Sequence, residues 1–464
     1  MDVAPSLVDA LRAAVGDAAI QSGDAIEQKH LGDWVVQSLP GEGPLAVATP
    51  RSTEEVSELL RICHAHGTPV VPQGGLTGLV GGATPVAGCV ALSMSRLRAI
   101  EEVDVAAGTI TVQAGVPLQS VQDAADAAGM LFPLDIGSRG SCLIGGNVST
   151  NAGGNRVLRY GMARDLVLGI EVVLADGTVM TALNKMLKNN AGYDLKHLFI
   201  GSEGTLGVVT RLVLRLFPKP ESVCTAFCGL PDYAAVLKLL ERARAKLGSA
   251  LSAFEVIWPE FYDLATTVHG CRPPLAEKAG VYVLMDSLGS DQVQDYQSFS
   301  ALIEAALDDG IVEDATLAQS FRESRELWAL RDSVAEFQRS FNPHVGFDVS
   351  VPIGRMQEFV DDCKATLAEL DPTLRSLWFG HIADSNLHIC VKQDEGGPSK
   401  KEIDRVVYGR VRAFDGSVSA EHGIGLLKKP YLGYSRSPVE LDIMRKLKTA
   451  LDPRGILNPG KIFD

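Results

Sequence analysis

The sequence lacks an excess of basic residues, long apolar runs and closely paired cysteines. Its 464 residues include 43 Lys and Arg against 57 Asp and Glu, a formal net charge of −14. Such an acidic chain argues against a nucleic-acid-binding protein and against docking on an anionic membrane, because both need basic patches. No apolar run approaches the ~20 residues that a transmembrane helix requires. We therefore expect no nucleic-acid partner and no integral membrane segment.

The eight cysteines are scattered, and none shows the CxxC spacing of a zinc ribbon or a redox motif. Cysteines without a disulfide framework are typical of a reducing compartment. The first residues, MDVAPSLVDALRAAVGD, have no basic region ahead of an apolar one and do not resemble a signal peptide. We therefore expect a cytoplasmic protein.

Glycine, by contrast, is abundant and concentrated. The stretch at 135–161, DIGSRGSCLIGGNVSTNAGGNRVLRYG, is the densest, and glycine-rich segments also occur at 72–82, 201–210 and 458–460. Glycine leaves backbone N–H groups bare, so they can close on phosphate oxygens or a flat ring. Segment 72–82 does not fit GxGxxG followed by a helix, which argues against a Rossmann dinucleotide site. Four such segments indicate a large anionic cofactor of another kind.

Hydrophobic periodicity and turn residues predict the elements of the first half of the chain. A helix capped by Thr53 and ended by Gly67 lies between two strands, which makes a βαβ unit. Asp176-Gly177 is a hairpin turn after an apolar strand. The predicted elements are helices at 4–16, from Thr53 to Gly67 and at 116–128, and strands at 45–48, 69–71, 90–94, 108–114 and 167–174.

The second half has a different character. After the boundary at Phe217-Pro218-Lys219-Pro220, strands alternate with amphipathic helices from about residue 225 to about residue 415. This pattern predicts a second α+β domain built on an antiparallel sheet. Helices are predicted around 293–308 and at 438–451.

Four motifs, in this order, resemble the FAD-linked oxidases of the vanillyl-alcohol oxidase type: PQGGLTGLVGG, IGGNVSTNAGGNRVLRYG, GSEGTLGVVT and the terminal NPGKIF. Within that family the sequence is most similar to the D-2-hydroxy-acid dehydrogenases, which include the D-2-hydroxyglutarate and D-lactate enzymes and the large glycolate oxidase subunit. The resemblance covers nearly the whole chain. It implies an α+β fold with a two-part FAD-binding domain and an α+β cap domain on an antiparallel sheet. The implied divisions are an N-terminal helical segment at 1–39, the FAD-binding domain at 40–220, the cap domain at 221–425 and a returning segment at 426–464.

The resemblance also implies which residues hold FAD, with the first glycine loop on the pyrophosphate. Some relatives attach the flavin to a histidine in that loop. The loop here has no His, Cys or Tyr, so we expect non-covalent FAD. The implied FAD-binding residues are Pro72, Gly74, Gly75, Leu76, Thr77, Gly78, Pro133, Asp135, Ser138, Gly145, Gly146, Asn147, Thr150, Asn151, Gly153, Gly154, Arg156, Tyr160, Gly161, Glu203, Gly204, Gly207, Val208, Asn458 and Lys461.

A second signal is LWFGHIADSNLHICVK, in which two strands flank the turn at 383–386. Pairing Ile382 with Leu387 would put His381 opposite His388, with Cβ atoms ~5 Å apart. Two such imidazoles can bind one cation, and the turn SAEHGIG adds Glu421 and the histidine after it. A His/His/Glu set is typical of a catalytic divalent-cation site. The alternative is a polar cross-strand pair on a surface hairpin.

In the dehydrogenases that this sequence resembles, the same pattern binds a metal. The resemblance implies His381, His388 and Glu421 as ligands, with Zn²⁺ the first expectation and Mn²⁺ the second, and His422 as the base. The expected mechanism has the metal holding the substrate, His422 taking the hydroxyl proton and a hydride passing to flavin N5. Arg331 stands where the resemblance places an arginine for the substrate carboxylate. Its alternative is a solvated ion pair with Asp332 or Glu336.

Three positions depart from the family pattern. Gly346, Ala335 and Cys390 stand where relatives carry a lysine, a threonine and an asparagine. These changes make the expected pocket less polar and less basic. They leave a D-2-hydroxy monocarboxylate such as D-lactate open beside the favoured D-2-hydroxyglutarate.

The expected function is therefore oxidation of a small-molecule D-2-hydroxy acid to the 2-oxo acid. The electron acceptor is expected to be an electron-transfer flavoprotein or a quinone rather than NAD, and a homodimer is left open. The alternatives of another class are a flavin-dependent transferase like the alkyl ether-lipid synthases and a non-catalytic flavin subunit. The HxxxxxxH pattern together with the EH pair argues against the last.

Overall fold

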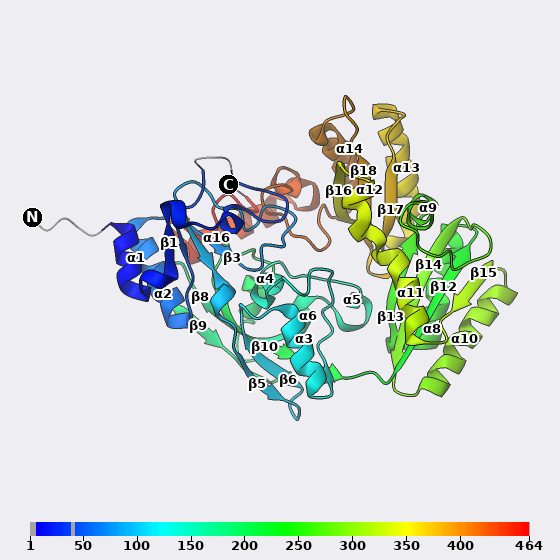
Figure 1. Ribbon diagram of the computed structural model, residues 1–464, viewed down its shortest axis with the longest axis horizontal. Coiled ribbons are helices and arrows are strands. Elements are labelled where there is room, and N and C mark those ends of the chain that lie inside the picture. The colour runs from blue at the N-terminus through cyan, green and yellow to red at the C-terminus, as the bar shows by residue number, and fades with distance from the viewer. Residues whose placement is uncertain (1–5, 39–41, 464) are drawn as a thin grey trace, which may run out of the picture. The chain divides into compact units, whose positions relative to one another are not determined.

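The computed structural model describes residues 6–38 and 42–463, and its contacts divide the chain into two compact units (Figure 1). Unit 1 contains residues 1–154, 161–219 and 421–464, and unit 2 contains residues 155–160 and 220–420. The predicted N-terminal helix forms as α1, Leu7–Val15, whereas positions 4 and 5 of that prediction lie outside the described residues.

The N-terminal part of unit 1 contains a four-stranded sheet of order β1-β2-β4-β3, in which β2 and β3 both run parallel to β4. Helix α2, Thr53–His66, connects β2 to β3 and confirms the predicted βαβ unit, and Gly67 ends it in the left-handed conformation. The cap is Ser52, whose hydroxyl accepts a hydrogen bond from Glu55 N, so the prediction of Thr53 is wrong by one residue. The Thr53 hydroxyl instead donates to Glu171 at 2.6 Å.

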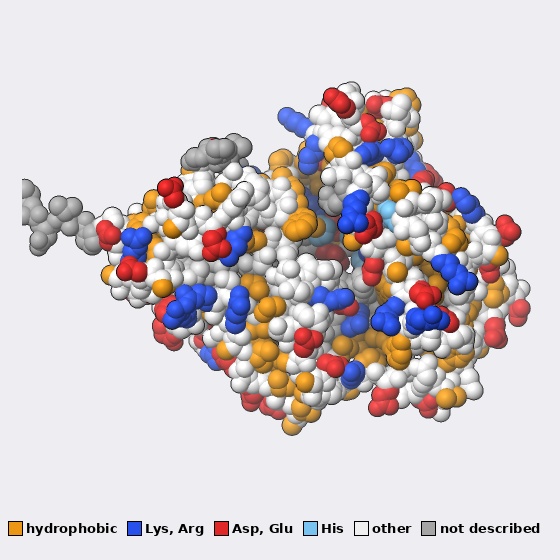
Figure 2. Space-filling view, in the orientation of Figure 1, with side chains coloured by type: hydrophobic (Ala, Val, Ile, Leu, Met, Phe, Trp, Pro, Cys, Tyr) orange, Lys and Arg blue, Asp and Glu red, His pale blue; other side chains and the backbone are white. Residues whose placement is uncertain are grey.

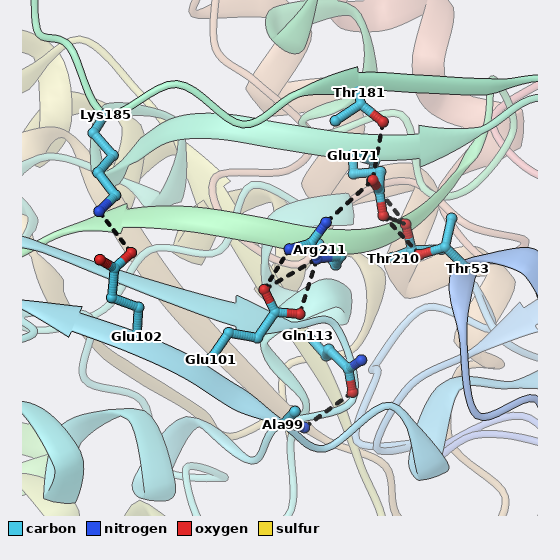
Figure 3. A network of polar contacts seen from close by, with 10 residues as sticks. All are labelled: Thr53, Ala99, Glu101, Glu102, Gln113, Glu171, Thr181, Lys185, Thr210 and Arg211. Carbon is cyan, nitrogen blue, oxygen red and sulfur yellow. Dashed lines mark hydrogen bonds and ion pairs between the residues drawn. The ribbon is translucent and has the colours of Figure 1, made fainter.

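The rest of unit 1 is organised by a five-stranded antiparallel sheet of order β5-β6-β10-β8-β9. Glu171 on β8 is only 5% exposed, and its carboxylate accepts from the hydroxyls of Thr53, Thr181 and Thr210, at 2.6, 2.9 and 3.1 Å (Figure 3). Arg211 adds an ion pair at 3.4 Å. The buried charge is therefore fully partnered, and the network ties α2 to this sheet.

The elements of unit 1 combine the two sheets with a short β7-β11 pair and surrounding helices. They are α1 (Leu7–Val15), β1 (Ile20–Ser22), β2 (Ala46–Ala48), α2 (Thr53–His66), β3 (Val70–Gln73), β4 (Val90–Ser93), β5 (Ile100–Asp104), β6 (Thr109–Gln113), α3 (Leu118–Ala127), β7 (Met130–Leu131), α4 (Ile144–Ser149), α6 (Ala163–Leu166), β8 (Val167–Val173), β9 (Val179–Ala182), α7 (Lys196–Phe199), β10 (Val208–Arg215), β11 (Phe217–Pro218), α15 (Leu432–Ser435) and α16 (Pro438–Leu451).

Unit 2 is built on one seven-stranded sheet of order β15-β12-β14-β13-β17-β18-β16, and every neighbouring pair is antiparallel. Helices α8 and α10 pack on each other and on β12 and β14 (Figure 1). Helices α9 and α11 contribute Phe261 and Leu330 to an apolar cluster that includes Phe227, Tyr282 and Phe379 of the sheet. The predicted α+β class with an antiparallel second sheet is therefore confirmed.

The elements of unit 2 alternate along the chain as the sequence predicted. They are α5 (Val157–Tyr160), β12 (Ser222–Leu230), α8 (Tyr233–Leu247), β13 (Leu251–Ile257), α9 (Pro259–Thr267), β14 (Val281–Gly289), α10 (Gln292–Asp308), β15 (Asp314–Leu317), α11 (Phe321–Asp332), α12 (Phe337–Ser340), β16 (His344–Ser350), α13 (Met356–Leu370), β17 (Ser376–His381), β18 (Asn386–Lys392) and α14 (Lys400–Ala413).

Charged side chains of both signs are interspersed over the face that Figure 2 presents. Among the described residues, no helix combines the length and the apolar character needed to cross a membrane. All eight cysteines are described and free, and seven of them are buried.

Candidate functional site

The first glycine loop of unit 1 packs directly on the second glycine-rich stretch. A Cβ built on Gly74 would lie 3.5 Å from the Cα of Gly146, on helix α4, Ile144–Ser149. A Cβ on Gly75 would lie 2.2 Å from the carbonyl oxygen of Ser141, a distance that no side chain can occupy. The glycines therefore allow two backbones to approach so closely that side chains would fill the space between them.

The other two glycine-rich segments join the same region of unit 1. The N–H of Glu203 donates to Ser149 O at 2.8 Å, which fixes the GSEG turn on the end of α4. Asn458, in the terminal segment, donates from its backbone to Val70 O and from Nδ2 to Gly82 O and Glu203 O, at 2.8, 3.0 and 2.7 Å. Segments that are far apart in the sequence thus converge on one backbone-lined region.

This region fits FAD on two further observations. The Oδ1 atom of Asn458 is buried and has no hydrogen-bond partner in the described structure, so it is ready to accept from a ligand. Lys461 is 1% exposed and donates to Thr84 O at 2.7 Å. Burial lowers the pKa of Lys461 to about 8, and an anion beside it would favour the charged form. A cofactor that brings acceptors, donors and phosphate suits these groups.

Unit 1 contains all but two of the residues predicted to bind FAD. Arg156 and Tyr160 belong to the short segment 155–160, which groups with unit 2. Their contact with FAD, like that of the other predicted residues, stays a prediction.

The two predicted histidine ligands lie on neighbouring strands of unit 2, but in another register. His388 pairs with Phe379, and His381 pairs with Glu255 on the other side, so the predicted pairing of His381 with His388 is wrong by two residues. The cause is a 3-10 turn at Ile382–Asp384, which removes Ile382 from the ladder. A slip of two residues keeps side chains on one face. The two imidazole rings therefore still meet, with centroids 5.5 Å apart.

A buried carboxylate fixes the first of these histidines. Glu255, on β13, is 1% exposed; its Oε1 binds His381 Nδ1, and its Oε2 accepts from Arg331 Nε at 3.0 Å. Burial disfavours the charged form, but His381 and Arg331 together outweigh it and lower the pKa of Glu255 to about 2. Because Nδ1 of His381 faces Glu255, the ring nitrogen on the opposite side is Nε2. A carboxylate behind the ring in this way is typical of a metal-binding histidine.

Arg331 lies in the same network and not at the surface. It is 7% exposed, and its partner is Glu255 rather than Asp332 or Glu336, so the predicted alternative of a solvated ion pair is wrong. Its Nη2 lies 3.3 Å from His381 Nε2. The guanidinium is thus beside the candidate metal histidine, while its binding of a substrate carboxylate stays a prediction.

Two of the three positions that depart from the family pattern, Gly346 and Cys390, lie beside the second histidine. In the pairing of β16 with β18, Gly346 lies opposite Cys390, and Asp348 lies opposite His388. These pairs are two positions apart, so they share one face of the sheet. A Cβ on Gly346 would meet nothing within 4 Å. The missing lysine therefore leaves open space next to His388.

The turn that carries Glu421 and His422 opens the last stretch of unit 1, residues 421–464. This stretch follows directly after residue 420, the last residue of unit 2. The N–H of Ala420 donates to Asp348 O at 3.4 Å, and Asp348 is the register partner of His388. Unit 2 contributes His381, His388 and Asp348 as candidate ligands, and unit 1 contributes Glu421 and His422. Imidazole and carboxylate donors suit zinc and manganese, so the residues present fit a divalent cation.

Sequence analysis assigned no site role to Glu255 or Asp348, and it did not identify what the side chain of Glu203 binds. Each is an acid within an apolar or glycine-rich stretch, SAFEVIW, VGFDVSV and GSEGTLG. A lone carboxylate in a strand that is otherwise buried needs a partner, and that signal could have identified the first two. Their partners could not be found, because they lie on strands distant in sequence.

Two family models match most of the chain. Residues 44–183 match the FAD binding domain, and residues 219–462 match the C-terminal domain of FAD linked oxidases. The second match alone covers more than half of the 464 residues.

Curated relatives match over nearly the full length. The chain is 42% identical to the mitochondrial D-2-hydroxyglutarate dehydrogenase of Bos taurus, covering 98% of this chain and 82% of that protein. It is 40% identical to the D-2-hydroxyglutarate dehydrogenase of Xanthomonas citri, covering 94% of this chain and 92% of that protein.

A solved structure extends the comparison to the fold. An alkyldihydroxyacetonephosphate synthase superposes with a TM-score of 0.76 at 20% identity, covering 99% of this chain and 86% of that chain. At this identity the match establishes the fold alone.

Proposed function

This chain belongs to the FAD-linked oxidase family, and we propose that it is a dehydrogenase that oxidises a D-2-hydroxy acid to the 2-oxo acid. We favour D-2-hydroxyglutarate as the substrate. The observation that carries the proposal is the meeting of His381 and His388 on one face of the sheet, with Glu255 behind the first ring. A surface hairpin needs no buried carboxylate behind its histidine, whereas a metal ligand commonly has one.

The proposed roles follow from the chemistry of each residue. His381, His388 and Glu421 would hold the cation, Zn²⁺ in the first place and Mn²⁺ in the second. When bound, FAD supplies the electron acceptor and the cation polarises the substrate hydroxyl. His422 takes the hydroxyl proton as a general base. Arg331, beside His381, would face the substrate carboxylate.

A second candidate substrate is a D-2-hydroxy monocarboxylate such as D-lactate. It is favoured by Gly346 and Cys390, which leave no cation and no amide beside His388 at those two positions. The second carboxylate of a dicarboxylate substrate such as D-2-hydroxyglutarate would gain no stabilisation from these two residues.

The setting of the reaction is part of the proposal. We propose dissociable FAD, an electron-transfer flavoprotein or a quinone as acceptor, and a cytoplasmic location. Eight free cysteines, seven of them buried, support a reducing compartment.

The test is anaerobic mixing of the flavoprotein with D-2-hydroxyglutarate, D-lactate and D-malate, followed by flavin absorbance. We expect bleaching by at least one acid, loss of bleaching after chelator treatment, and the ratio of rates to identify the preferred acid. His422→Asn should keep its FAD and lose about 10²–10⁴-fold in the rate of flavin reduction, the usual contribution of a general base.

His344→Asn is the matched control, because it removes a half-buried imidazole from β16 without touching the proposed ligands. It should reduce its flavin at the wild-type rate. Bleaching that survives chelation would remove the metal from the mechanism, and an undiminished rate in His422→Asn would remove the base. A flavoprotein that none of the acids bleaches would favour a transferase or a non-catalytic subunit.

A further inference from the structure

Glu203 is a buried acid whose polar groups are all engaged within unit 1. The residue is 7% exposed and has a φ of 53°, in the left-handed region that non-glycine residues seldom adopt. Its N–H donates to Ser149 O at 2.8 Å, and its carbonyl accepts from Asn458 Nδ2 at 2.7 Å. Backbone strain that is held from two sides is characteristic of a functional position.

The carboxylate of Glu203 binds the turn that follows the proposed base. Oε1 accepts from Ile424 N at 2.7 Å, and Oε2 accepts from Gly425 N at 2.8 Å. Gly423 has a φ of 83°, and a Cβ on it would lie 2.8 Å from Oε1. The turn therefore approaches the carboxylate as closely as glycine permits, and charge-assisted bonds from two successive N–H groups hold it there.

The other side of the turn is fixed by Val80. Its carbonyl accepts from Leu426 N and Leu427 N at 2.8 and 3.1 Å, and a Cβ on Gly425 would lie 2.3 Å from the same oxygen. The residues after His422 are thus clamped between the first glycine loop and the GSEG turn. His422 itself is two residues away from the first clamped N–H.

We propose that Glu203 is a positioning residue for His422: its buried carboxylate fixes the Gly423–Gly425 turn and, through it, the backbone that carries Glu421 and His422. The inference rests on the proposed function, since it assigns that turn the base and a ligand. A carboxylate suits this task because it offers two acceptor atoms and no donor. Glutamine has the same shape but presents an NH₂ group to one of the two N–H groups.

The test compares Glu203→Gln with Glu171→Gln. Glu171 is a matched control, because it is an equally buried glutamate of unit 1 whose carboxylate binds threonine hydroxyls on the β8-β10 sheet instead of the turn (Figure 3). Glu203→Gln should lower the rate constant of flavin reduction at saturating substrate about 10²-fold, the usual effect of a small misplacement. Its KM should change less than about threefold, as expected for a defect in the transition state alone.

A second readout does not depend on activity. Hydrogen exchange of at least one of the backbone N–H groups of Ile424 and Gly425 should become at least about tenfold faster in Glu203→Gln, since the amide leaves only one acceptor oxygen for the two groups. Exchange of both should stay unchanged in Glu171→Gln. Gly423→Ala, which pushes the turn away from an intact carboxylate, should reproduce the kinetic defect and carries the test if Glu203→Gln does not fold.

The outcomes separate the two proposals. Equal rate constants in Glu203→Gln and the wild type, or equal losses in Glu203→Gln and Glu171→Gln, would overturn the positioning role while leaving the proposed function intact. Unchanged exchange at Ile424 and Gly425 would overturn it as well. If the wild type is not bleached by any hydroxy acid, the proposed function fails by itself, and the exchange data still decide whether Glu203 holds the turn.

Discussion

The two units build their candidate sites from different materials. In unit 1 the surfaces that fit FAD are backbone: glycines at 74, 75 and 146 let two segments approach within side-chain distance. In unit 2 the surroundings of the candidate metal histidines are side chains, with Glu255, Arg331 and His381 buried together. One site depends on the absence of atoms, and the other depends on charges that compensate one another.

This difference determines how each site can fail. A backbone-lined site is lost when any Cβ enters it, but it carries little charge that needs a partner. A site of buried charges tolerates changes of charge less than changes of shape, because removing one partner leaves the other unpaired in a low dielectric. Three changes, from the largest expected effect to the smallest, test this contrast.

The largest effect is expected in unit 2, from Glu255→Ala. The change leaves Arg331 and His381 without their shared carboxylate, and breaking a buried ion pair typically costs about 3–5 kcal/mol. Affinity for the metal should also fall about 10–100-fold, because the ring of His381 loses its orienting partner. Denaturant unfolding gives the first quantity, and zinc titration of the metal-free protein gives the second.

Glu260→Ala is the control for that change. Glu260 pairs with Lys364 at 2.6 Å, but its side chain is 43% exposed, and such surface pairs contribute only about 0–1 kcal/mol. Equal losses of stability in Glu255→Ala and Glu260→Ala would show that ion pairing does not stabilise the buried cluster of unit 2. The proposed contrast between the two units would then be wrong.

A smaller effect is expected in unit 1, from Gly75→Ala. Its new Cβ would lie 2.2 Å from Ser141 O, so the loop must move, and overpacking of this kind costs about 1–3 kcal/mol. We expect most of the bound FAD to be lost on gel filtration. Gly137→Ala is the control, because a Cβ there meets nothing within 4 Å. Retention of FAD by Gly75→Ala at the wild-type level would mean that the close packing does not form the cofactor site.

The same contrast explains what could be predicted from the sequence. The glycine segments were found because glycine spacing is local, and the βαβ unit, the hairpin at 176–177 and helix α16 followed from local patterns as well. The face shared by His381 and His388 was also predictable, since a period of two fixes faces even when register slips. The register itself was not, because the 3-10 turn at Ile382–Asp384 has no distinct signal.

The network around Glu255 and the hydrogen bonds from the Gly423–Gly425 turn to Glu203 could not be predicted from the sequence, for a different reason. Glu255 meets Arg331 and His381 across 76 and 126 positions of the chain, and Glu203 meets Ile424 across 221. Only the order of strands in the sheet and the return of the chain to unit 1 bring these residues together. Patterns of neighbouring residues carry no information on such pairings.

The smallest effect concerns a buried cation that unit 1 places near its glycine segments, Lys461. Burial lowers its pKa from 10.5 to about 8, so above pH 8 the folded state releases a proton that the unfolded state keeps. Stability should therefore rise with pH in the wild type relative to Lys461→Met, by roughly 1.5 kcal/mol between pH 8 and about pH 9.5, because each pKa unit corresponds to about 1.4 kcal/mol. Denaturant unfolding of the flavin-free proteins at several pH values measures the difference. If the free energies of unfolding of the two proteins changed with pH in parallel, Lys461 would keep its proton throughout. That result requires an anionic partner for Lys461, and unit 1 would then hold a compensated buried charge as unit 2 does.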